Sequence, residues 1–306
     1  MKRLLSWLAP LIMVAALGTP AAAESVQPLV DAEWAATNIS RPGVVFLDVR
    51  NAQDDYAKGH IPGAVHSSYT KGGWRVTDAK GIEGMLPPPE QIETLVGELG
   101  IDNASHVVVV AAGLSASDMS TATRVYWTFK VSGHDRVSIL NGGMKAYANG
   151  QRPLQKDAGQ RPAARFKATM RPGLVVTKDD VVNATRLGSP LVDIRSSDQY
   201  LGVNKPPAVK RYGTIPGAMS LPENWLTVDN GGVFRDRETL KRLAAAANVP
   251  LTGRLIAFCN SGQLGSLGWF VLSEILGNKD ATLYDGSMIE WAADPALPID
   301  RKLLTN

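Results

Sequence analysis

An internal repeat limits the folds open to this chain more than any other feature of its sequence. Four segments recur in the same order in both halves of the 306-residue chain, roughly 150 residues apart. They are Val44–Arg50 and Ser189–Arg195, Gly59–Ala64 and Gly213–Ala218, His106–Ala111 and Arg254–Cys259, and Leu140–Met144 and Tyr284–Met288. A solenoid repeats about every 20 to 50 residues, so a period this long indicates duplication of a whole domain. The sequence therefore predicts two tandem domains of ordinary size.

Within each half, short apolar runs alternate with amphipathic stretches. Val107–Val110 and Leu255–Phe258 are apolar at every position, which is typical of central strands in a parallel sheet that is covered on both faces. We expect helices in five other stretches: Asp31–Asn38, Pro89–Leu99, Ser120–Lys130, Asp236–Ala247 and Ser266–Leu276. The prediction is an α/β protein in which each domain is a mainly parallel sheet with helices on both faces.

Residues 1–23 have the pattern of a cleavable secretory signal. Met1–Arg3 is basic, Leu4–Gly18 is apolar, and Ala21–Ala23 supplies the small residues that a signal peptidase accepts. The apolar run is short for a membrane span of about 20 residues, and no cysteine follows it that could carry a lipid anchor. We therefore expect cleavage before Glu24, a periplasmic or secreted protein, and no stable membrane anchor afterwards.

The rest of the chain divides into two domains and a connection. We expect residues 24–152 to form the first domain and residues 174–306 to form the second. Residues 153–173 are rich in Pro, Arg and Ala and show no clear period, which favours an interdomain linker.

Composition and charge exclude several classes of protein. Hydrophobic residues make up 44% of the chain and charged residues 20%, as in ordinary globular proteins. Removal of the signal would take Lys2 and Arg3 from the 32 basic residues, which then nearly balance the 29 acidic ones. A chain so close to neutral gives no reason to expect nucleic acid or a membrane surface as a partner.

The single cysteine, Cys259, excludes an internal disulfide and is the candidate reactive group. It ends an apolar strand, and a loop leads from it to a helix that we expect to begin near Ser266, with Ser266 as its cap. Parallel α/β sheets bind ligands at the carboxyl ends of their strands, where backbone N–H groups can surround an anion. We expect such a cradle for the sulfur in six residues: Asn260, Ser261, Gly262, Gln263, Leu264 and Gly265. These amides and the helix dipole predict a thiol pKa below that of an ordinary cysteine.

A lone thiol in this position is compatible with several roles. Free cysteines are often buried structural residues, but the strand, loop and helix around Cys259 favour a functional one. The context fits sulfur transfer, hydrolysis of phosphate esters and redox sensing. A cysteine phosphatase needs an arginine at the end of its loop to hold phosphate. Position 265 is Gly265, and residues 260–264 contain no Arg or Lys, which disfavours the phosphatase.

Four motifs occur in order along residues 29–300. They are the strand ends Asp48/Arg50 and Asp193/Arg195, the blocks Gly59–Ala64 and Gly213–Ala218, the segment Arg124–Gly143, and Phe258–Gly262 with Tyr284–Ser287 and Glu290–Trp291. In this combination they resemble the motifs of the tandem-domain rhodanese and mercaptopyruvate sulfurtransferase family, in its exported bacterial form. The resemblance implies a catalytically silent first domain, in which Ala111 stands where Cys259 stands in the second.

The resemblance also implies a mechanism and a set of partners. The thiolate of Cys259 would take sulfur from a small anionic donor as a persulfide and pass it to a thiophilic acceptor, either cyanide, a thiol or a protein. No metal or organic cofactor is implied. The four histidines also lack the spacing of zinc ligands: His60, His66, His106 and His134.

The identity of the donor stays open between thiosulfate, mercaptopyruvate and related compounds. Members that prefer thiosulfate have a cationic residue two positions after the cysteine, whereas this chain has Ser261, as in members that prefer mercaptopyruvate. An arginine that usually precedes a Tyr-Leu-Gly segment is Gln199 here. Arg195, Lys210 and Arg211 are the candidate contacts to an anionic donor.

Two other functions remain as alternatives at this level. In the first, the chain is a sulfur-relay or protein-binding module without turnover, in which Cys259 accepts sulfur only from a protein partner or not at all. In the second, the thiol is a redox sensor that forms a sulfenate with peroxide.

Overall fold

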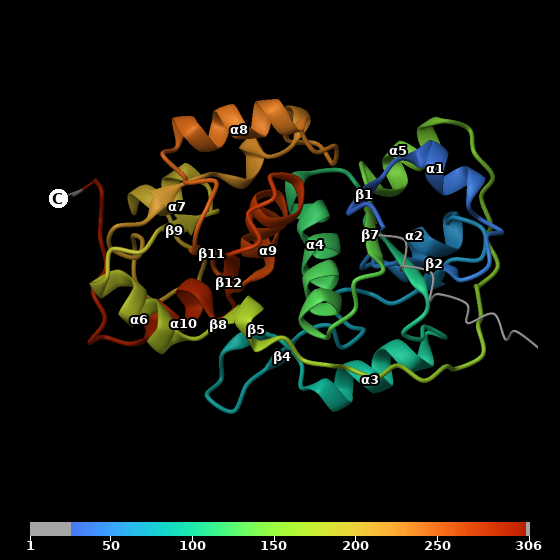
Figure 1. The fold of residues 1–306 in the computed structure, drawn as a ribbon, viewed down its shortest axis with the longest axis horizontal. Coiled ribbons are helices and arrows are strands. Elements are labelled where there is room, and N and C mark those ends of the chain that lie inside the picture. Colours follow the sequence, from blue (N-terminus) through green and yellow to red (C-terminus); the bar gives the residue numbers. More distant parts are fainter. Residues whose placement is uncertain (1–25, 304–306) are drawn as a thin grey trace, which may run out of the picture.

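Two five-stranded parallel sheets with the same strand order form the frame of the protein (Figure 1). The computed structural model describes residues 26–303. The order in the first sheet is β1 (Leu29–Val30), β7 (Val137–Leu140), β6 (His106–Val110), β2 (Val44–Asp48) and β3 (Val65–His66). The order in the second sheet is β8 (Val175–Val176), β12 (Ala281–Tyr284), β11 (Leu255–Phe258), β9 (Leu191–Asp193) and β10 (Met219–Ser220). The repeat in the sequence is thus a repeat of the fold, with β6 and β11 at the two centres.

Helices connect the strands, and all five that the sequence predicts are present. The first domain contains α1 (Ala32–Thr37), α2 (Gln53–Lys58), α3 (Pro89–Glu98), α4 (Ala116–Val131) and α5 (Gly143–Asn149). The second contains α6 (Lys178–Arg186), α7 (Ser197–Leu201), α8 (Arg237–Ala246), α9 (Gln263–Phe270) and α10 (Ser287–Ala293). Shorter turns of 3-10 helix lie at Pro172–Leu174, Glu223–Trp225 and Val228–Asn230, and a π-helical turn, Val271–Ile275, follows α9.

Both faces of each sheet are buried, as the continuous apolar runs predict. In β6, Val107 and Val108 belong to different hydrophobic clusters, because successive side chains of a strand point to opposite faces. In β11, Leu255 and Ile256 are divided in the same way. The expected α/β architecture, with helices on both faces of each parallel sheet, is confirmed.

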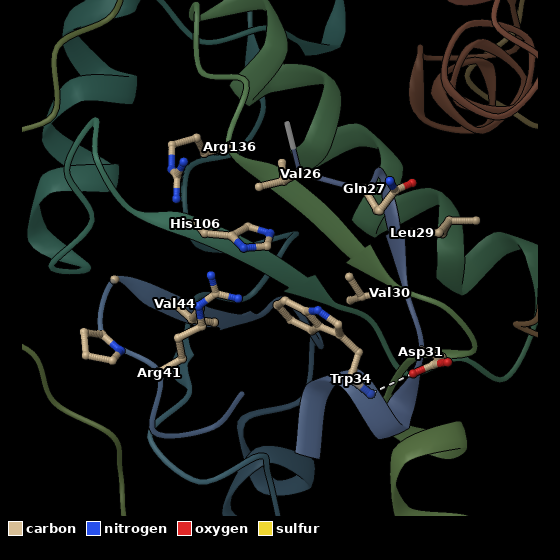
Figure 2. A pocket seen from close by; sticks show the side chains of 12 residues that line it. Val26, Gln27, Leu29, Val30, Asp31, Trp34, Arg41, Val44, His106 and Arg136 are labelled. Carbon is tan, nitrogen blue, oxygen red and sulfur yellow. Dashed lines mark hydrogen bonds between the residues drawn. The ribbon is translucent and has the colours of Figure 1, made fainter. Parts of the chain in front are cut away.

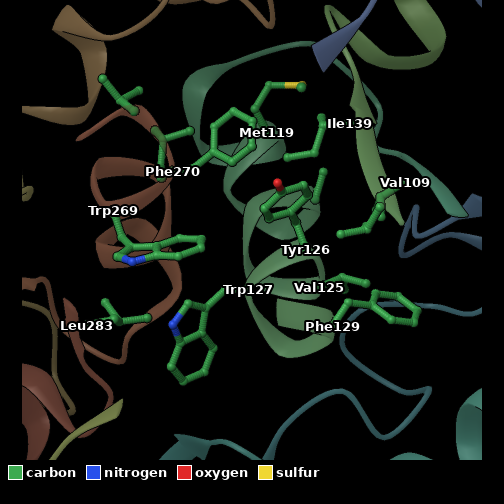
Figure 3. Close-up of a cluster of buried hydrophobic side chains, with 14 of the residues drawn as sticks. Val109, Met119, Val125, Tyr126, Trp127, Phe129, Ile139, Trp269, Phe270 and Leu283 are labelled. Carbon is green, nitrogen blue, oxygen red and sulfur yellow. The ribbon is translucent and has the colours of Figure 1, made fainter. Parts of the chain in front are cut away.

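The two domains share one hydrophobic core, because α4 and α9 pack against each other between the sheets (Figure 3). Tyr126 of α4 meets Phe270 of α9 edge to face, with 4.9 Å between the ring centroids. Its hydroxyl also donates a hydrogen bond of 2.8 Å to Glu274. The hydroxyls of Thr123 and Ser266 lie 2.9 Å apart along the same contact. These contacts fix the silent half of the repeat against the half that contains the cysteine.

A hairpin of the first domain reaches the second domain. It consists of β4 (Val76–Thr77) and β5 (Glu83–Met85), which pair in antiparallel fashion and lie near β8 at the lower edge of Figure 1. Directly after β5, the amide of Leu86 donates to the carboxylate of Asp285 at 2.7 Å. The hairpin therefore belongs to one domain by sequence and contacts the other in space.

The segment between the domains lies along the first domain before it enters the second (Figure 1). The amide of Ala164 donates to the carbonyl of Gly97 at 2.9 Å, and Phe166 is buried. Within residues 153–173, which the sequence predicts to be the linker, the ordered features are an isolated bridge at Gln155 and the start of a 3-10 turn. The connection is thus bound to the surface of the first domain.

The predicted signal peptide, residues 1–23, lies outside the described residues. Within residues 26–303, none of the helices has both the length and the hydropathy that a bilayer crossing requires.

Candidate active site

Cys259 directly follows β11, so it lies at the carboxyl edge of the second sheet, on its central strand. The neighbouring strand β9 ends at Asp193, which is in register with Phe258. Residues 259–262 then lead into α9. Cys259 is only 1% exposed, so the thiol is enclosed by its own loop and by the segments that pack on that loop.

The loop is fastened to the start of α10 by one side chain. The hydroxyl of Ser287 accepts hydrogen bonds from the amides of Cys259 (3.1 Å) and Gly262 (3.2 Å) and donates to the carbonyl of Tyr284 at 2.8 Å. Ser287 has a φ of +49°, a left-handed conformation that is uncommon for residues other than glycine. A second bond joins the same segments, because the amide of Met288 donates to the carbonyl of Cys259 at 3.0 Å. The sequence analysis missed this role of Ser287.

The environment of the sulfur changes one expectation. Burial raises the pKa of the Cys259 thiol and is the largest influence on it. Hydrogen bonds from the backbone N–H groups of Gly265 and Ser261 lower the pKa, the carboxylate of Asp193 raises it, and the Ser287 hydroxyl lowers it. The balance lies above the ordinary value. The prediction of a lowered pKa was therefore wrong, because the sequence shows the amides around the thiol but does not show how fully the thiol is removed from water.

Gly262, and not Ser266, precedes the first turn of α9. It has a φ of +73°, and a Cβ there would lie 2.5 Å from Nη1 of Arg124, so the position needs glycine for its conformation and for space. The hydroxyl of Ser266 donates instead to the carbonyl of Gln263, at 2.6 Å, inside the helix. The expected cap at Ser266 was wrong, because its side chain lies in the contact between α4 and α9, beside Thr123.

The other residues of the predicted cradle contact their surroundings through side chains. Asn260 donates to the side-chain oxygen of Gln199 at 2.9 Å, and Gln263 donates to the hydroxyl of Ser120 at 2.9 Å. Leu264 packs against the core that the two domains share. Of the six residues, Ser261 and Gly265 are the two whose amides hydrogen-bond to the sulfur.

The first domain closes the site from the opposite side. Gly84 of β5 packs on the loop, and a Cβ on Gly84 would lie 3.1 Å from the carbonyl oxygen of Ser261. Arg124 of α4 is fully buried, and its Nη1 lies 2.6 Å from a carboxylate oxygen of Asp285. Its Nη2 donates to the carbonyl of Gly84 at 3.0 Å. The site therefore contains a cation from the domain that has no cysteine.

Tyr69 of the first domain also lies close to the sulfur. Burial raises the pKa of the Tyr69 hydroxyl, Arg124 and Arg75 oppose this increase, and the negative charge of a Cys259 thiolate adds to it. The guanidinium carbon of Arg75 lies 5.7 Å from the centroid of the Tyr69 ring. The sequence motifs included Arg124 but gave no sign that it meets the cysteine loop, because that contact depends on how the two domains pack.

The three cationic residues expected to contact the donor lie in other arrangements. Arg195 is buried beside Asp193, with N–O distances of 2.6 to 3.1 Å, and also donates to the carbonyl of Gly213 at 2.9 Å. Arg211 donates to four backbone carbonyls at and beyond the end of α10, those of Trp291, Ala292, Asp294 and Leu297. Lys210 is exposed. The two arginines brace loops in this structure, so their main hydrogen-bonding groups are already occupied and do not face a donor.

A cavity of about 330 Å³ lies in the seam between the hairpin and the second domain. Its lining combines Lys80 and Met85 of the first domain with Lys178, Asp285 and Glu290 of the second. Asp285 is also the partner of Arg124, so the inner wall of this cavity borders the segments that cover Cys259.

A separate cavity of about 430 Å³ lies in the first domain, at the amino ends of β2 and β6. Figure 2 shows Arg41, His106 and Arg136 around it, together with Trp34. Burial lowers the pKa of His106 to about 4, with smaller contributions from the two arginines, so its imidazole is neutral at pH 7. The ring bonds the hydroxyl of Ser138 at 2.8 Å. None of the residues that line this cavity belongs to the Cys259 loop.

Metal binding finds no support in the part of the chain that the structure describes. Within it, no three His, Cys, Asp or Glu side chains gather in a group that could hold an ion.

Comparisons with known proteins agree with the geometry. The family model for the rhodanese-like domain matches residues 31–150 and 177–294. A protein of Mycobacterium tuberculosis named "Putative thiosulfate sulfurtransferase" is 32% identical over 280 residues, which cover 89% of this chain and 97% of that protein. A protein of Haloferax volcanii with the same name is 29% identical over 287 residues, covering 89% and 96%.

A solved structure shows the same fold. It is an anaerobic ergothioneine biosynthesis enzyme from Chlorobium limicola, with a TM-score of 0.78 and 24% sequence identity. The match covers 92% of this chain and 71% of that one. Because the family model matches both halves, and because the relatives align along nearly the whole sequence, the chain belongs to the rhodanese-like domain family and carries two such domains in tandem.

Proposed function

We propose that this protein is a sulfurtransferase that moves sulfane sulfur from thiosulfate, mercaptopyruvate or a related donor to cyanide or a thiol through a persulfide on Cys259. The observation that carries the proposal is the position of Cys259 at the end of the central strand, with the N–H groups of Ser261 and Gly265 bonded to its sulfur. Backbone N–H donors stabilise an anion and cannot themselves lose a proton at neutral pH. They therefore suit a thiolate and a persulfide anion equally. The homology to thiosulfate sulfurtransferases supports the same class of reaction.

The reaction consists of two displacements at sulfur. In the first, the Cys259 thiolate attacks the outer sulfur of the donor, a new S–S bond forms, and the donor's own bond to that sulfur breaks. The leaving group departs with the electron pair, as sulfite when the donor is thiosulfate. In the second, the acceptor attacks the outer sulfur of the persulfide, and the Cys259 thiolate leaves with the pair. Electrons balance without an oxidant or a cofactor, and ping-pong kinetics are expected.

Intact mass spectrometry tests this proposal directly. The protein should gain one sulfur atom on treatment with thiosulfate or mercaptopyruvate, should lose it again when cyanide is added, and should show neither change in the variant Cys259→Ser. EDTA should leave the transfer unchanged. If the folded protein gains no sulfur from any small donor, the enzyme assignment fails and a relay or binding module without turnover takes its place.

We also propose that residues 1–23 direct export and are removed before Glu24, which leaves a first domain of residues 24–152, a linker of residues 153–173 and a second domain of residues 174–306. The basic, apolar and small-residue segments of the leader support this. A secreted or periplasmic product whose mass corresponds to a chain starting at Glu24 would agree. A full-length chain that stays with the cells would contradict it.

A further inference from the structure

Arg124 is a buried cation of the first domain that lies directly against the cysteine loop of the second. The side chain is not exposed to solvent, and its Nη1 lies 2.6 Å from Asp285. The same nitrogen would be 2.5 Å from a Cβ on Gly262, so the guanidinium occupies the space beside the turn that follows Cys259. Its Nε is buried and has no hydrogen-bond partner among the described residues.

The ion pair of Arg124 and Asp285 also holds the hairpin. Nη2 of Arg124 donates to the carbonyl of Gly84 at 3.0 Å, and the amide of Leu86 donates to Oδ2 of Asp285 at 2.7 Å. Two backbone groups on one edge of β5 are thus bound by the two halves of one ion pair. Because Gly84 also packs on Ser261, this pair fixes β5, α4 and the cysteine loop relative to one another.

Stability alone is a weak reason for such a pair. Removing two charges from water costs most of what their attraction returns, and an apolar pair of similar volume often stabilises a protein as well. Geometry is a stronger reason, because the planar guanidinium presents several N–H groups in fixed directions and can hold two acceptors at once. Arg124 does this with Asp285 and Gly84, at the place where the loop must keep its N–H groups directed at the sulfur.

We propose that Arg124 is a positioning residue for the sulfur-transfer reaction, which through Asp285 and the Gly84 carbonyl holds the hairpin against the Gly262 turn and so keeps the cysteine loop in its reactive geometry. The inference rests on the proposed function, because it assigns a role in that reaction. The cation also faces the thiol. Burial lowers the pKa of Arg124, but Asp285, Tyr69 and Cys259 raise it more, so the guanidinium stays charged beside the thiolate.

Three variants test the role of Arg124: Arg124→Lys, Arg124→Gln, and Arg124→Gln combined with Asp285→Asn. Two measurements are made on each, the kcat and KM of sulfur transfer and the pH profile of Cys259 alkylation by iodoacetamide. A nucleophile misplaced by about 1 Å costs roughly a hundredfold in rate, so we expect the double variant to lose about that much in kcat with little change in KM. Its alkylation midpoint should move to higher pH, because the nearby cation is gone. Arg124→Lys keeps the charge but not the fork, so its midpoint should stay close to that of the wild type while kcat lies between the two.

Tyr126→Phe is the matched control. Tyr126 lies on the same helix and makes another buried bond between the domains, to Glu274, away from the cysteine loop. This variant should unfold at a lower temperature and keep the wild-type kcat and alkylation midpoint. If the double variant at Arg124 and Asp285 also keeps both values, the pair only joins the domains and the proposal is overturned.

Two complications are separable. Arg124→Gln leaves the Asp285 carboxylate buried and unpaired, so this variant can fail to fold. The double variant removes both charges and then carries the test. If the wild-type protein transfers no sulfur at all, the proposed function fails, and the alkylation profile still decides whether Arg124 controls the thiol.

Discussion

The carboxyl ends of β6 and β11 can be compared residue by residue, because the backbone around them is bonded in the same way. In the first domain the amide of Met144 donates to the carbonyl of Ala111 at 2.8 Å. In the second domain the amide of Met288 donates to the carbonyl of Cys259 at 3.0 Å. The duplicated frame is intact on both sides, so the difference between the two sites must come from side chains.

The first difference lies at the start of the helix that follows the last central strand. Gly143 and Ser287 occupy equivalent positions in the repeat, and both have positive φ, +57° and +49°. In the first domain a Cβ on Gly143 would overlap the carbonyl oxygen of Ala111 and lie 2.8 Å from the amide nitrogen of Gly113. In the second domain that space is open and holds the hydroxyl from which the cysteine loop is suspended. The silent loop has collapsed onto a glycine, and the reactive loop is held away from the backbone by a serine.

The second difference lies at the amino ends of α4 and α9. Ser115 caps α4 by accepting from the amide of Asp118 at 3.1 Å, and the Asp118 carboxylate accepts from the amide of Leu114 at 3.0 Å. The first turn of α9 has neither a side-chain cap nor an acidic residue, and the amide of Gly265 bonds to sulfur instead. A helix amino terminus attracts negative charge. In the first domain a resident carboxylate fills that position, and in the second the position is left to the thiolate.

The largest effect is expected from moving the cysteine across the repeat. In the double variant Ala111→Cys/Cys259→Ser the thiol stands at the end of a central strand, but it has no counterpart of Ser287 and it shares its helix terminus with Asp118. We expect sulfur transfer to fall by at least about a thousandfold, as for loss of a nucleophile. The single variant Ala111→Cys should keep wild-type turnover and gain one sulfur in an intact-mass measurement. A gain of two sulfur atoms would show that the first loop is also competent and would break the comparison.

A smaller but clear effect is expected from Ser287→Gly, which gives the second domain the residue of the first. Glycine adopts the required φ, but the amides of Cys259 and Gly262 lose their acceptor, at a cost of about 1 to 3 kcal/mol for each buried donor. We expect kcat to fall by about 10- to 100-fold, because the loop amides are no longer held in place. Ser287→Ala should lose as much activity and be less stable by about 1 kcal/mol, since alanine keeps the strained φ. Full activity of the glycine variant together with an inactive alanine variant would assign the effect to the backbone and not to the hydroxyl.

The serine-for-glycine difference was visible in the sequence, since Leu140–Met144 and Tyr284–Met288 are aligned segments of the repeat. The strands, most of the helices and the position of Cys259 could also be predicted, because each depends on local patterns such as the apolar run Leu255–Phe258 and the loop after it. The cap of α9 was assigned to Ser266 because serine is a good cap by propensity. Gly262 takes that place because the Ser266 side chain is used in a contact with the other domain.

What could not be predicted depends on distant parts of the chain. Arg124 is 135 positions from Cys259 in the sequence, and its contact with the Gly262 turn exists only because α4 packs on α9. Arg195 and Arg211 are cationic and lie near the motif residues, but the structure uses them to brace loops. The direction of the thiol pKa shift also depends on burial, which the local sequence around Cys259 does not determine.

A third and smaller effect concerns pH. Because burial raises the pKa of Cys259 above its unfolded value, the native state keeps the proton longer than the unfolded state does. The thiol therefore contributes stability that is fully present below the unfolded pKa, about 8.5 for an ordinary cysteine, and is lost as the pH rises through the native pKa. Between pH 7 and pH 10 the wild type should lose more thermal stability than Cys259→Ser, and iodoacetamide should become fast only above about pH 8.5. Equal losses for the two proteins, or fast alkylation at pH 7, would show that the amides outweigh burial after all.

The smallest effects separate the two helix termini. Asp118→Asn removes the resident charge of α4 while keeping an oxygen acceptor for the amide of Leu114, so the free energy of unfolding should fall by about 0.3 to 1 kcal/mol and turnover should not change. Gln263→Glu is the reciprocal change, because it places a carboxylate in the first turn of α9, where a thiolate must form. A charge interaction of the same size, opposing the reaction, corresponds to a decrease of about two- to fivefold in kcat/KM at low ionic strength, and added salt should reduce it. Each protein is measured by thermal unfolding and by steady-state sulfur transfer. If Asp118→Asn slows turnover as much as Gln263→Glu does, the terminus of α4 acts on the reacting sulfur, and the first domain is not electrostatically silent.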